Sequence, residues 1–153
     1  MINTVIFDVD GTLIDSVDLH AAAWQDAFKK FGKNVELQAV RDQIGKGGNE
    51  LMPVFLSKKE IDQFGEEMKE YRSEHFKKNY IHRVTPFPKV RQLFELIKGE
   101  GKKIAIGSSA NEEELDVYLK LVNVTDLVDM KTSADDAERA KPHPDIFQVI
   151  LHK

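Results

Sequence analysis

The chain has 153 residues, a size typical of one domain that buries a substantial core. It contains no cysteine, which excludes disulfides and cysteine-ligated metals, and its net charge of -4 without any lysine- or arginine-rich run argues against nucleic acid as a partner. No apolar run approaches the roughly 20 residues that span a bilayer, and no signal peptide precedes the first predicted strand, so we expect a soluble, cytoplasmic protein.

The first predicted element is a buried strand on Thr4–Phe7, a short apolar and β-rich run. Two carboxylates, Asp8 and Asp10, follow it directly and therefore lie at the C-terminal end of the strand, which is the edge of an open α/β sheet where ligands bind. Gly11 then allows the chain to turn away. Taken alone, the pattern is also compatible with a strand that ends in an acidic turn.

Apolar residues at helical spacing predict four helices between residues 16 and 83. Ser57 and Glu60 form a predicted capping box at the start of the fourth helix, whereas Gly65 inside it costs about 1 kcal/mol relative to alanine. Together the four predicted helices make a small bundle. Their apolar positions are Trp24, Ala27, Phe28 and Phe31; Leu37, Val40 and Ile44; Leu51, Met52, Phe55 and Leu56; and Ile61, Phe64, Met68, Tyr71 and His75.

Strands and helices alternate from residue 84 onward, which predicts a parallel sheet with crossover helices. Asn111 and Glu114 form a predicted capping box at the start of one of these helices. Residues 3–9 supply the first strand of the sheet, so the helical bundle is an insertion. The remaining predicted elements are a helix on Val90, Leu93, Phe94 and Ile97, a strand on Ile104–Ile106, a helix on Leu115, Tyr118, Leu119 and Val122, a strand on Leu127, Val128 and Met130, and a helix on Ile146, Phe147, Val149 and Ile150.

The run Asp-Val-Asp-Gly-Thr-Leu-Ile-Asp-Ser that begins at Asp8 resembles the first signature of the haloacid dehalogenase-like superfamily, which consists mostly of magnesium-dependent phosphatases that work through an aspartyl-phosphate. Ile104–Ser108, a strand that ends in a hydroxyl, resembles the second signature. The pattern Lys-Pro-x-Pro-Asp-x-Phe that begins at Lys141 resembles the third. Three motifs in the right order, each at a predicted strand end or loop, favour the family over unrelated turns and a solvated lysine.

The resemblance implies an α/β fold with two parts. Residues 1–15 and 84–153 form a Rossmann-like parallel-sheet catalytic core, which is incomplete at the C-terminus, and residues 16–83 form an inserted α-helical bundle that acts as a cap domain. The implied activity is that of a magnesium-dependent phosphatase of the haloacid dehalogenase-like type, a phosphomonoester hydrolase that uses Mg²⁺ and acts on a small phosphorylated metabolite such as a sugar phosphate or a phosphoglycolate-like ester.

The resemblance also assigns roles to four predicted catalytic residues. Asp8 is the nucleophile, and a carboxylate needs no separate base for this attack. Asp10 protonates the leaving oxygen and then deprotonates the attacking water, and an aspartate at this position is what the phosphatase branch requires. Ser108 hydrogen-bonds the phosphate, and Lys141 neutralises both phosphate and nucleophile. The predicted Mg²⁺ ligands are Asp8 and Asp10, the latter through its backbone carbonyl.

Predicted substrate-binding residues lie in the loops after the first two motif strands and in the cap. Gly11 and Thr12 belong to the first loop, and Ser109 and Asn111 belong to the second, where backbone amides complete the phosphate cradle. His20 and Lys46 are the cap candidates, because the first helix and the Gly45–Gly48 loop could face Asp8, and the cap of this family selects the substrate. Trp24 lies on the apolar stripe and is expected in the core.

The fourth family signature, a strand ending in acidic residues beyond the third-motif lysine, has no match here. Only 12 residues follow Lys141, all with a helical pattern, and Asp135 and Asp136 precede it. We therefore expect a truncated chain whose first strand becomes an open apolar edge. Such a chain would bind Mg²⁺ poorly and turn over slowly. An alternative is a catalytically incomplete fragment that self-associates or pairs with a companion C-terminal fragment.

Two alternatives share part of this pattern. A β-phosphoglucomutase-like phosphoryl transfer uses the same first-strand acids, but Ser109–Glu112 and the presence of Lys46 without an arginine in the cap loop depart from the mutase pattern and favour a phosphatase. A receiver domain of the response-regulator type also places acids and a lysine around a phosphorylatable aspartate. It carries that aspartate on a middle strand and has no inserted bundle, so the motif order argues against it.

Overall fold

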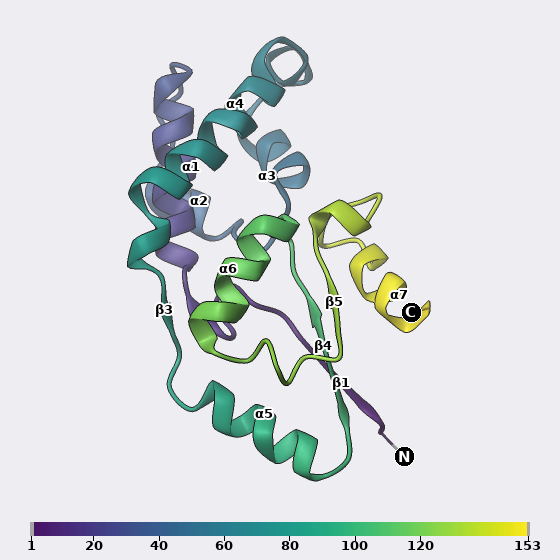
Figure 1. Cartoon of the computed structure of the whole chain (residues 1–153). Coiled ribbons are helices and arrows are strands. Elements are labelled where there is room, and N and C mark those ends of the chain that lie inside the picture. The colour runs from purple at the N-terminus through teal and green to yellow at the C-terminus, as the bar shows by residue number, and fades with distance from the viewer. Residues whose placement is uncertain (1, 153) are drawn as a thin grey trace. The chain divides into compact units, whose positions relative to one another are not determined.

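The computed structural model of the protein describes residues 2–152 and divides the chain into two compact units (Figure 1). The first unit consists of Met1–Asp15 and Thr85–Lys153 and has α/β structure, and the second consists of Ser16–Val84 and is helical. The roles of catalytic core and cap for these units remain predictions. No helix within the described part of the chain combines the length and the apolar character needed to cross a membrane.

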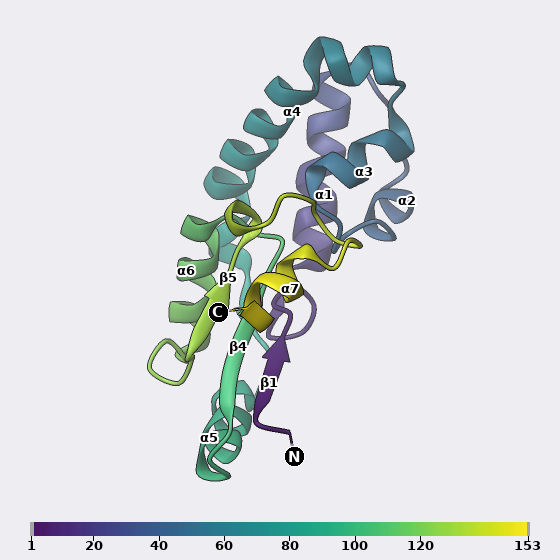
Figure 2. The same cartoon turned by 90° about the vertical axis from the view of Figure 1, so that its right-hand side faces the viewer.

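The α/β unit is built on a three-stranded parallel sheet, which confirms the predicted fold class. Its strands are β1 (Thr4–Phe7), β4 (Lys103–Gly107) and β5 (Met130–Thr132), in the order β1-β4-β5 (Figure 2). Thr4 pairs with Lys103 and Ala105 with Met130, so the C-terminal ends of all three strands meet at one edge. The central strand β4 is buried throughout Ile104–Gly107, in keeping with its continuous apolar run.

Three helices cover this sheet: α5 (Val90–Gly99), α6 (Glu112–Val122) and α7 (Asp145–His152). In Figure 2, α6 and α7 lie on opposite sides of the sheet. Helix α7 packs closely on β4 at Gly107, because a β-carbon built there would lie 3.1 Å from Ile146 Cγ2 and 3.2 Å from Ile150 Cδ1. Gly107 therefore belongs to the strand and provides room for a helix, whereas the sequence pattern placed it in a turn.

Two further differences from the predicted elements lie in short segments. The third strand of the sheet begins at Met130, because the turn after α6 includes Leu127, whose N–H donates to the carbonyl of Val124. The short strands β2 (Ile14–Asp15) and β3 (Thr85–Pro86) pair antiparallel and were not predicted. Strands of two residues carry no periodic pattern that a sequence could reveal.

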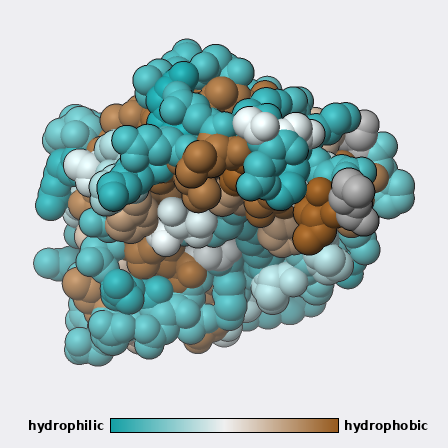
Figure 3. Space-filling model, turned by 90° about the horizontal axis from the view of Figure 1, so that it is seen from below, coloured by the Kyte–Doolittle hydropathy of each residue, from teal (hydrophilic) through white to brown (hydrophobic). Residues whose placement is uncertain are grey.

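Apolar side chains also reach the surface of the α/β unit. Leu96 of α5 is 70% exposed, and Leu93, Val117 and Leu121 are more than two-fifths exposed. The view in Figure 3 shows apolar residues interspersed with hydrophilic ones. Single apolar residues distributed in this way are usual on folded proteins and do not define a site.

The helical unit contains α1 (Val17–Lys30), α2 (Leu37–Arg41), α3 (Gly48–Phe55), α4 (Lys58–Asn79) and the short 3₁₀ helix η1 (Ile81–Arg83). The capping box of Ser57 and Glu60 at the start of α4 forms as predicted. Helix α4 continues through Gly65. A β-carbon at this position would lie 3.1 Å from Ile61 Cγ2, so the glycine allows close side-chain packing, which offsets its poor helix propensity. The buried core contains Ala21, Trp24, Ala27, Phe28, Val40, Leu51, Met52, Leu56 and Met68.

Phe28 is the aromatic centre of this helical core. It is fully buried, and its ring lies 5.8 Å from that of Trp24 and 5.2 Å from that of Phe55, measured between centroids. The substitution Phe28→Ala is expected to lower the free energy of unfolding by about 3–5 kcal/mol, since it leaves a cavity as well as removing apolar contact. Urea denaturation followed by circular dichroism measures this change. The control Val54→Ala, at a position 49% exposed on α3, should cost less than about 0.5 kcal/mol, and equal losses for both variants would contradict the expectation.

Candidate active site

The loop after β1 holds Asp8 on a tight and well-bonded turn. Gly11 has a φ of 73°, in the left-handed region that glycine adopts without strain. The N–H groups of Thr12 and Leu13 donate to the carbonyl of Val9 at 3.1 and 2.8 Å, and the Val9 side chain is fully buried. The carboxylate of Asp8 therefore projects from a fixed backbone, with 38% of its side chain exposed.

Lys141 brings the third motif to the first. Its Nζ donates to Asp8 Oδ1 at 2.6 Å and to the carbonyl of Gly107 at 2.9 Å, and it lies 5.2 Å from the ring centroid of Phe147. Only 15% of the lysine side chain is exposed, so the ion pair is screened by solvent much less than a surface pair would be. A lysine 133 positions away in sequence thus lies directly against the predicted nucleophile.

Ser108 places the second motif at the same edge of the sheet. It follows β4 immediately, is fully buried, and donates its backbone N–H to the carbonyl of Thr132 at 3.0 Å. Its Oγ accepts a hydrogen bond from the N–H of Ala110 at 3.0 Å, so the hydroxyl hydrogen can be donated to another group. Because Lys141 binds the carbonyl of the preceding residue, Gly107, the three motifs converge on one place.

The other predicted residues of the α/β unit lie in the two loops beside this edge. Asp10 forms an isolated bridge with Ile14, and Gly11 and Thr12 are exposed in the first loop. Ser109 follows Ser108 and is half-buried. The Asn111 side chain accepts the N–H of Glu114 at 2.9 Å and so caps α6. Fewer backbone amides are available for phosphate than expected, because the N–H groups of Ala110, Glu112 and Glu114 all donate to protein oxygens.

The cap candidates belong to the helical unit and have partners within it. His20 is 5% exposed, its ring stacks on Phe76 with 4.2 Å between centroids, and its Nδ1 pairs with the guanidinium of Arg72. Lys46 donates to Gln43 Oε1 at 2.6 Å. Trp24 lies in the core, at 5% exposure. Substrate contacts of His20 and Lys46 therefore stay predictions.

The predicted magnesium ligands, Asp8 and Asp10, would supply oxygen atoms from the start of the first loop. Lys141 donates to Oδ1 of Asp8, and no hydrogen bond within residues 2–152 engages Oδ2, so Oδ2 can attack phosphorus while Oδ1 keeps a second lone pair for a metal. Hard oxygen donors of this kind suit Mg²⁺. The described residues contain no cluster of three or more His, Cys, Asp or Glu side chains that could bind a metal, so Asp8 and Asp10 stay predicted ligands.

Glu114 differs from its predicted role in a capping box. Asn111 caps the helix, but the returning bond from the Glu114 carboxylate is not formed. Glu114 is only 3% exposed, and its Oε1 has no hydrogen-bond partner among residues 2–152. A buried carboxylate oxygen without a donor costs free energy, and a glutamate in a first helical turn gives no sequence signal that it will be buried.

Replacing Glu114 by glutamine is therefore expected to stabilise the protein. The neutral side chain has nearly the same shape and loses less hydration on burial, so the free energy of unfolding should rise by about 1 kcal/mol or more. Thermal or urea unfolding measures the change. Glu113→Gln is the matched control, because Glu113 is exposed in the same turn and its loss should be neutral or slightly destabilising through the helix dipole. A Glu114→Gln protein less stable than this control would contradict the expectation.

Comparison with known proteins identifies the class to which this fold and site belong. The family model described as haloacid dehalogenase-like hydrolase matches residues 5–153. The chain therefore belongs to the haloacid dehalogenase-like hydrolase family, and the prediction from the three motifs is confirmed.

Individual relatives agree with this assignment. The chain is 26% identical over 149 residues to a phosphorylated carbohydrates phosphatase of Thermotoga maritima, covering 97% of this chain and 69% of the relative. It is 30% identical over 141 residues to a phosphoglycolate phosphatase of Aquifex aeolicus, covering 92% of this chain and 64% of the relative. The chain thus spans about two thirds of the length of these proteins. Both are named as phosphatases, in agreement with the predicted enzyme class.

A solved structure shows the same fold. A haloacid dehalogenase-like hydrolase from Bacteroides fragilis, described as putative, superposes with a TM-score of 0.88 at 19% identity, over 99% of this chain and 72% of that one. Identity at this level supports the fold alone.

Proposed function

We propose that the protein is a Mg²⁺-dependent phosphomonoester hydrolase that works through an aspartyl-phosphate on Asp8. The contact that carries this proposal is the 2.6 Å hydrogen bond from Lys141 Nζ to Asp8 Oδ1, with the same ammonium 2.9 Å from the carbonyl of Gly107 and therefore next to Ser108. A carboxylate, a cation and a hydroxyl at the C-terminal edge of a parallel sheet are the groups that phosphoryl transfer needs.

In the first half-reaction, the free oxygen of Asp8 attacks the phosphorus atom while the bond to the ester oxygen breaks. Asp10 gives its proton to the leaving oxygen, and the released alcohol departs. In the second half-reaction, Asp10 takes a proton from water, which attacks the acyl-phosphate. Inorganic phosphate leaves and the Asp8 carboxylate is restored.

Lys141 and Ser108 hold the phosphoryl group during both steps. The ammonium binds the Asp8 carboxylate, and a cation at this place would reduce the repulsion between the carboxylate and the phosphate. The Ser108 hydroxyl has a hydrogen to donate, because its oxygen already accepts from Ala110. Mg²⁺ bound by Asp8 and Asp10 would neutralise further negative charge on the phosphoryl oxygens.

The proposed substrate is a small phosphorylated metabolite. Relatives named for phosphorylated carbohydrates and for phosphoglycolate support this class. We assign phosphate contacts to the loops that contain Gly11, Thr12, Ser109 and Asn111. The unit Ser16–Val84 is proposed to act as the cap, with His20 and Lys46 as its contributions to recognition of the leaving group.

Trapping the covalent intermediate tests the proposal directly. The protein is mixed with Mg²⁺ and a panel of sugar phosphates and phosphoglycolate, quenched with acid and treated with borohydride, which reduces an aspartyl-phosphate to homoserine. We expect phosphate release that chelation of Mg²⁺ abolishes, and a homoserine at position 8 in peptide mass spectra. Release without metal, or modification at another residue, would refute the proposal, and isomerised ester without released phosphate would indicate a mutase.

A further inference from the structure

The segment after β5 is bonded directly to the loop that follows β4. The N–H of Ser108 donates to the carbonyl of Thr132 at 3.0 Å, and the N–H of Ala134 donates to the carbonyl of Ala110 at 2.8 Å. The third bond involves a side chain: Asp135 Oδ2 accepts the N–H of Glu112 at 2.8 Å. The Ser108–Asn111 loop is therefore bonded to this segment at Ser108 and Ala110, and the first residue of α6 is bonded to it directly after the loop.

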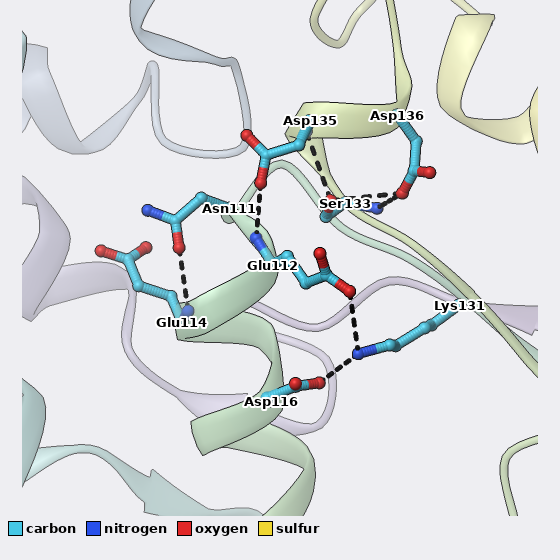
Figure 4. Close-up of polar contacts among 8 residues, drawn as sticks. All are labelled: Asn111, Glu112, Glu114, Asp116, Lys131, Ser133, Asp135 and Asp136. Atoms are coloured by element: carbon cyan, nitrogen blue, oxygen red, sulfur yellow. Dashed lines mark hydrogen bonds and ion pairs between the residues drawn. The ribbon is translucent and has the colours of Figure 1, made fainter.

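Asp135 is itself fixed in place. It lies in the single 3₁₀ turn η2 (Ala134–Asp136), and its N–H donates to Ser133 Oγ at 3.3 Å. The Asp136 carboxylate accepts the N–H of Ser133 at 2.8 Å and completes a capping box. Figure 4 shows Asp135 directed toward the first residue of α6, while Asn111 and Glu114 point to the other side of the helix start. Helix α6 thus has two caps, Asn111 from its own chain segment and Asp135 from η2, the turn that follows β5.

The position of this carboxylate matters for anion binding. The N-terminus of a helix carries a partial positive charge that favours phosphate, and the amide of Glu112 is part of that positive end. The negatively charged Asp135 carboxylate accepts the N–H of Glu112, and Glu112 is the first residue after the loop proposed to hold phosphate. Its hydrogen bond orders the loop, whereas its charge repels a bound anion.

We propose that Asp135 is a positioning residue that orders the Ser108–Asn111 loop and, through its charge, limits how tightly this loop retains phosphate. The proposal rests on the proposed function, in which inorganic phosphate is the last product to leave. Among the acids around α6, Asp116 offers a comparison, because it pairs with Lys131 and lies farther along the helix (Figure 4).

Two substitutions separate the two effects. Asp135→Asn keeps an oxygen acceptor for the Glu112 amide and removes the charge, whereas Asp135→Ala removes both. Asp116→Asn is the matched control, since it also removes one negative charge from the surroundings of α6. The dissociation constant of inorganic phosphate in the presence of Mg²⁺ is measured by titration calorimetry, together with kcat and KM for an ester that the protein hydrolyses.

We expect Asp135→Asn to bind phosphate about threefold more tightly, as removal of one charge from a helix N-terminus predicts. Asp135→Ala should bind phosphate at least about fivefold more weakly and raise KM, because one of the three bonds that order this region, the one to the Glu112 amide, is lost. Asp116→Asn should change the phosphate affinity less than twofold. A merely structural Asp135 would instead make both variants bind more weakly or leave both unchanged.

The inference requires that Asp135→Asn binds phosphate more tightly than the natural protein and that Asp135→Ala binds it more weakly. Any other order of affinities overturns it, as does a natural protein that binds no phosphate. The calorimetric series does not depend on turnover. If no ester is hydrolysed while the affinities follow the expected order, the proposed function fails and the role of Asp135 stands. If esters are hydrolysed and the affinities are flat, only the role of Asp135 fails.

Discussion

Replacing Asp8 by asparagine is expected to lower kcat for phosphate release by at least about a thousandfold. The amide oxygen is a far poorer nucleophile than a carboxylate and forms no acyl-phosphate that water can open. The substitution also replaces the ion pair with Lys141 by a contact between an ammonium and a neutral amide, so the ammonium loses its anionic partner. Phosphate release is measured under saturating substrate and Mg²⁺, alongside thermal unfolding that shows whether the variant is folded.

The matched control is Asp15→Asn. Asp15 lies in β2 at the end of the same loop, is exposed, and pairs through its backbone with Thr85. Its loss should leave kcat within about twofold of the natural protein, as expected for a surface substitution away from the reacting groups. An Asp8→Asn protein that retains a tenth of the activity would contradict the assignment of the nucleophile.

Replacing Lys141 by methionine is expected to lower kcat by about a hundredfold or more, the usual cost of removing one group that stabilises charge in the transition state. Methionine preserves most of the length and apolar stem of lysine, so the space beside Phe147 stays filled while Asp8 Oδ1 and the carbonyl of Gly107 lose their donor. The loss should appear mainly in kcat, because the lysine contacts the nucleophile in the absence of substrate.

Two further variants bracket this result. Lys141→Arg should recover only part of the activity, since a planar guanidinium cannot reproduce the two bonds of a single Nζ atom. Lys131→Met removes a cation from β5 that pairs with Asp116 and Glu112, and it should leave kcat within about twofold. Similar kcat losses for Lys131→Met and Lys141→Met would show that net charge, and not the contact with Asp8, matters.

Much of the fold could be predicted from the sequence, because its elements are long and regular enough to show a period. The four helices of Ser16–Val84 follow apolar stripes, and the strands β1 and β4 are short apolar runs. The meeting of Asp8 and Lys141 was predictable only through the motif resemblance, since no local pattern relates residues 133 positions apart.

Other features depend on tertiary contacts that no pattern reveals. His20 pairs with Arg72, 52 positions away on another helix, so its burial was not evident from the stripe of α1. The position of β5 follows from the side chain of Asp129, which accepts the N–H of Ile104 at 2.7 Å just before the strand begins. Asp135 and Asp136 were noted for their order relative to Lys141, and only the structure shows that Asp135 binds the start of α6.

Because residue 107 is a glycine, the position of the Lys141 ammonium depends on how closely α7 packs on β4. Even a methyl group at this position would press against Ile146, Ile150 and Phe147, so α7 could not keep its present distance from β4. Lys141 precedes that helix by four residues, and its Nζ touches both Asp8 and the carbonyl of Gly107 itself. The absence of a β-carbon at Gly107 thereby sets how near the Lys141 ammonium can approach the Asp8 carboxylate. The packing of α7 on β4 and the distance from Lys141 Nζ to Asp8 both depend on this one position.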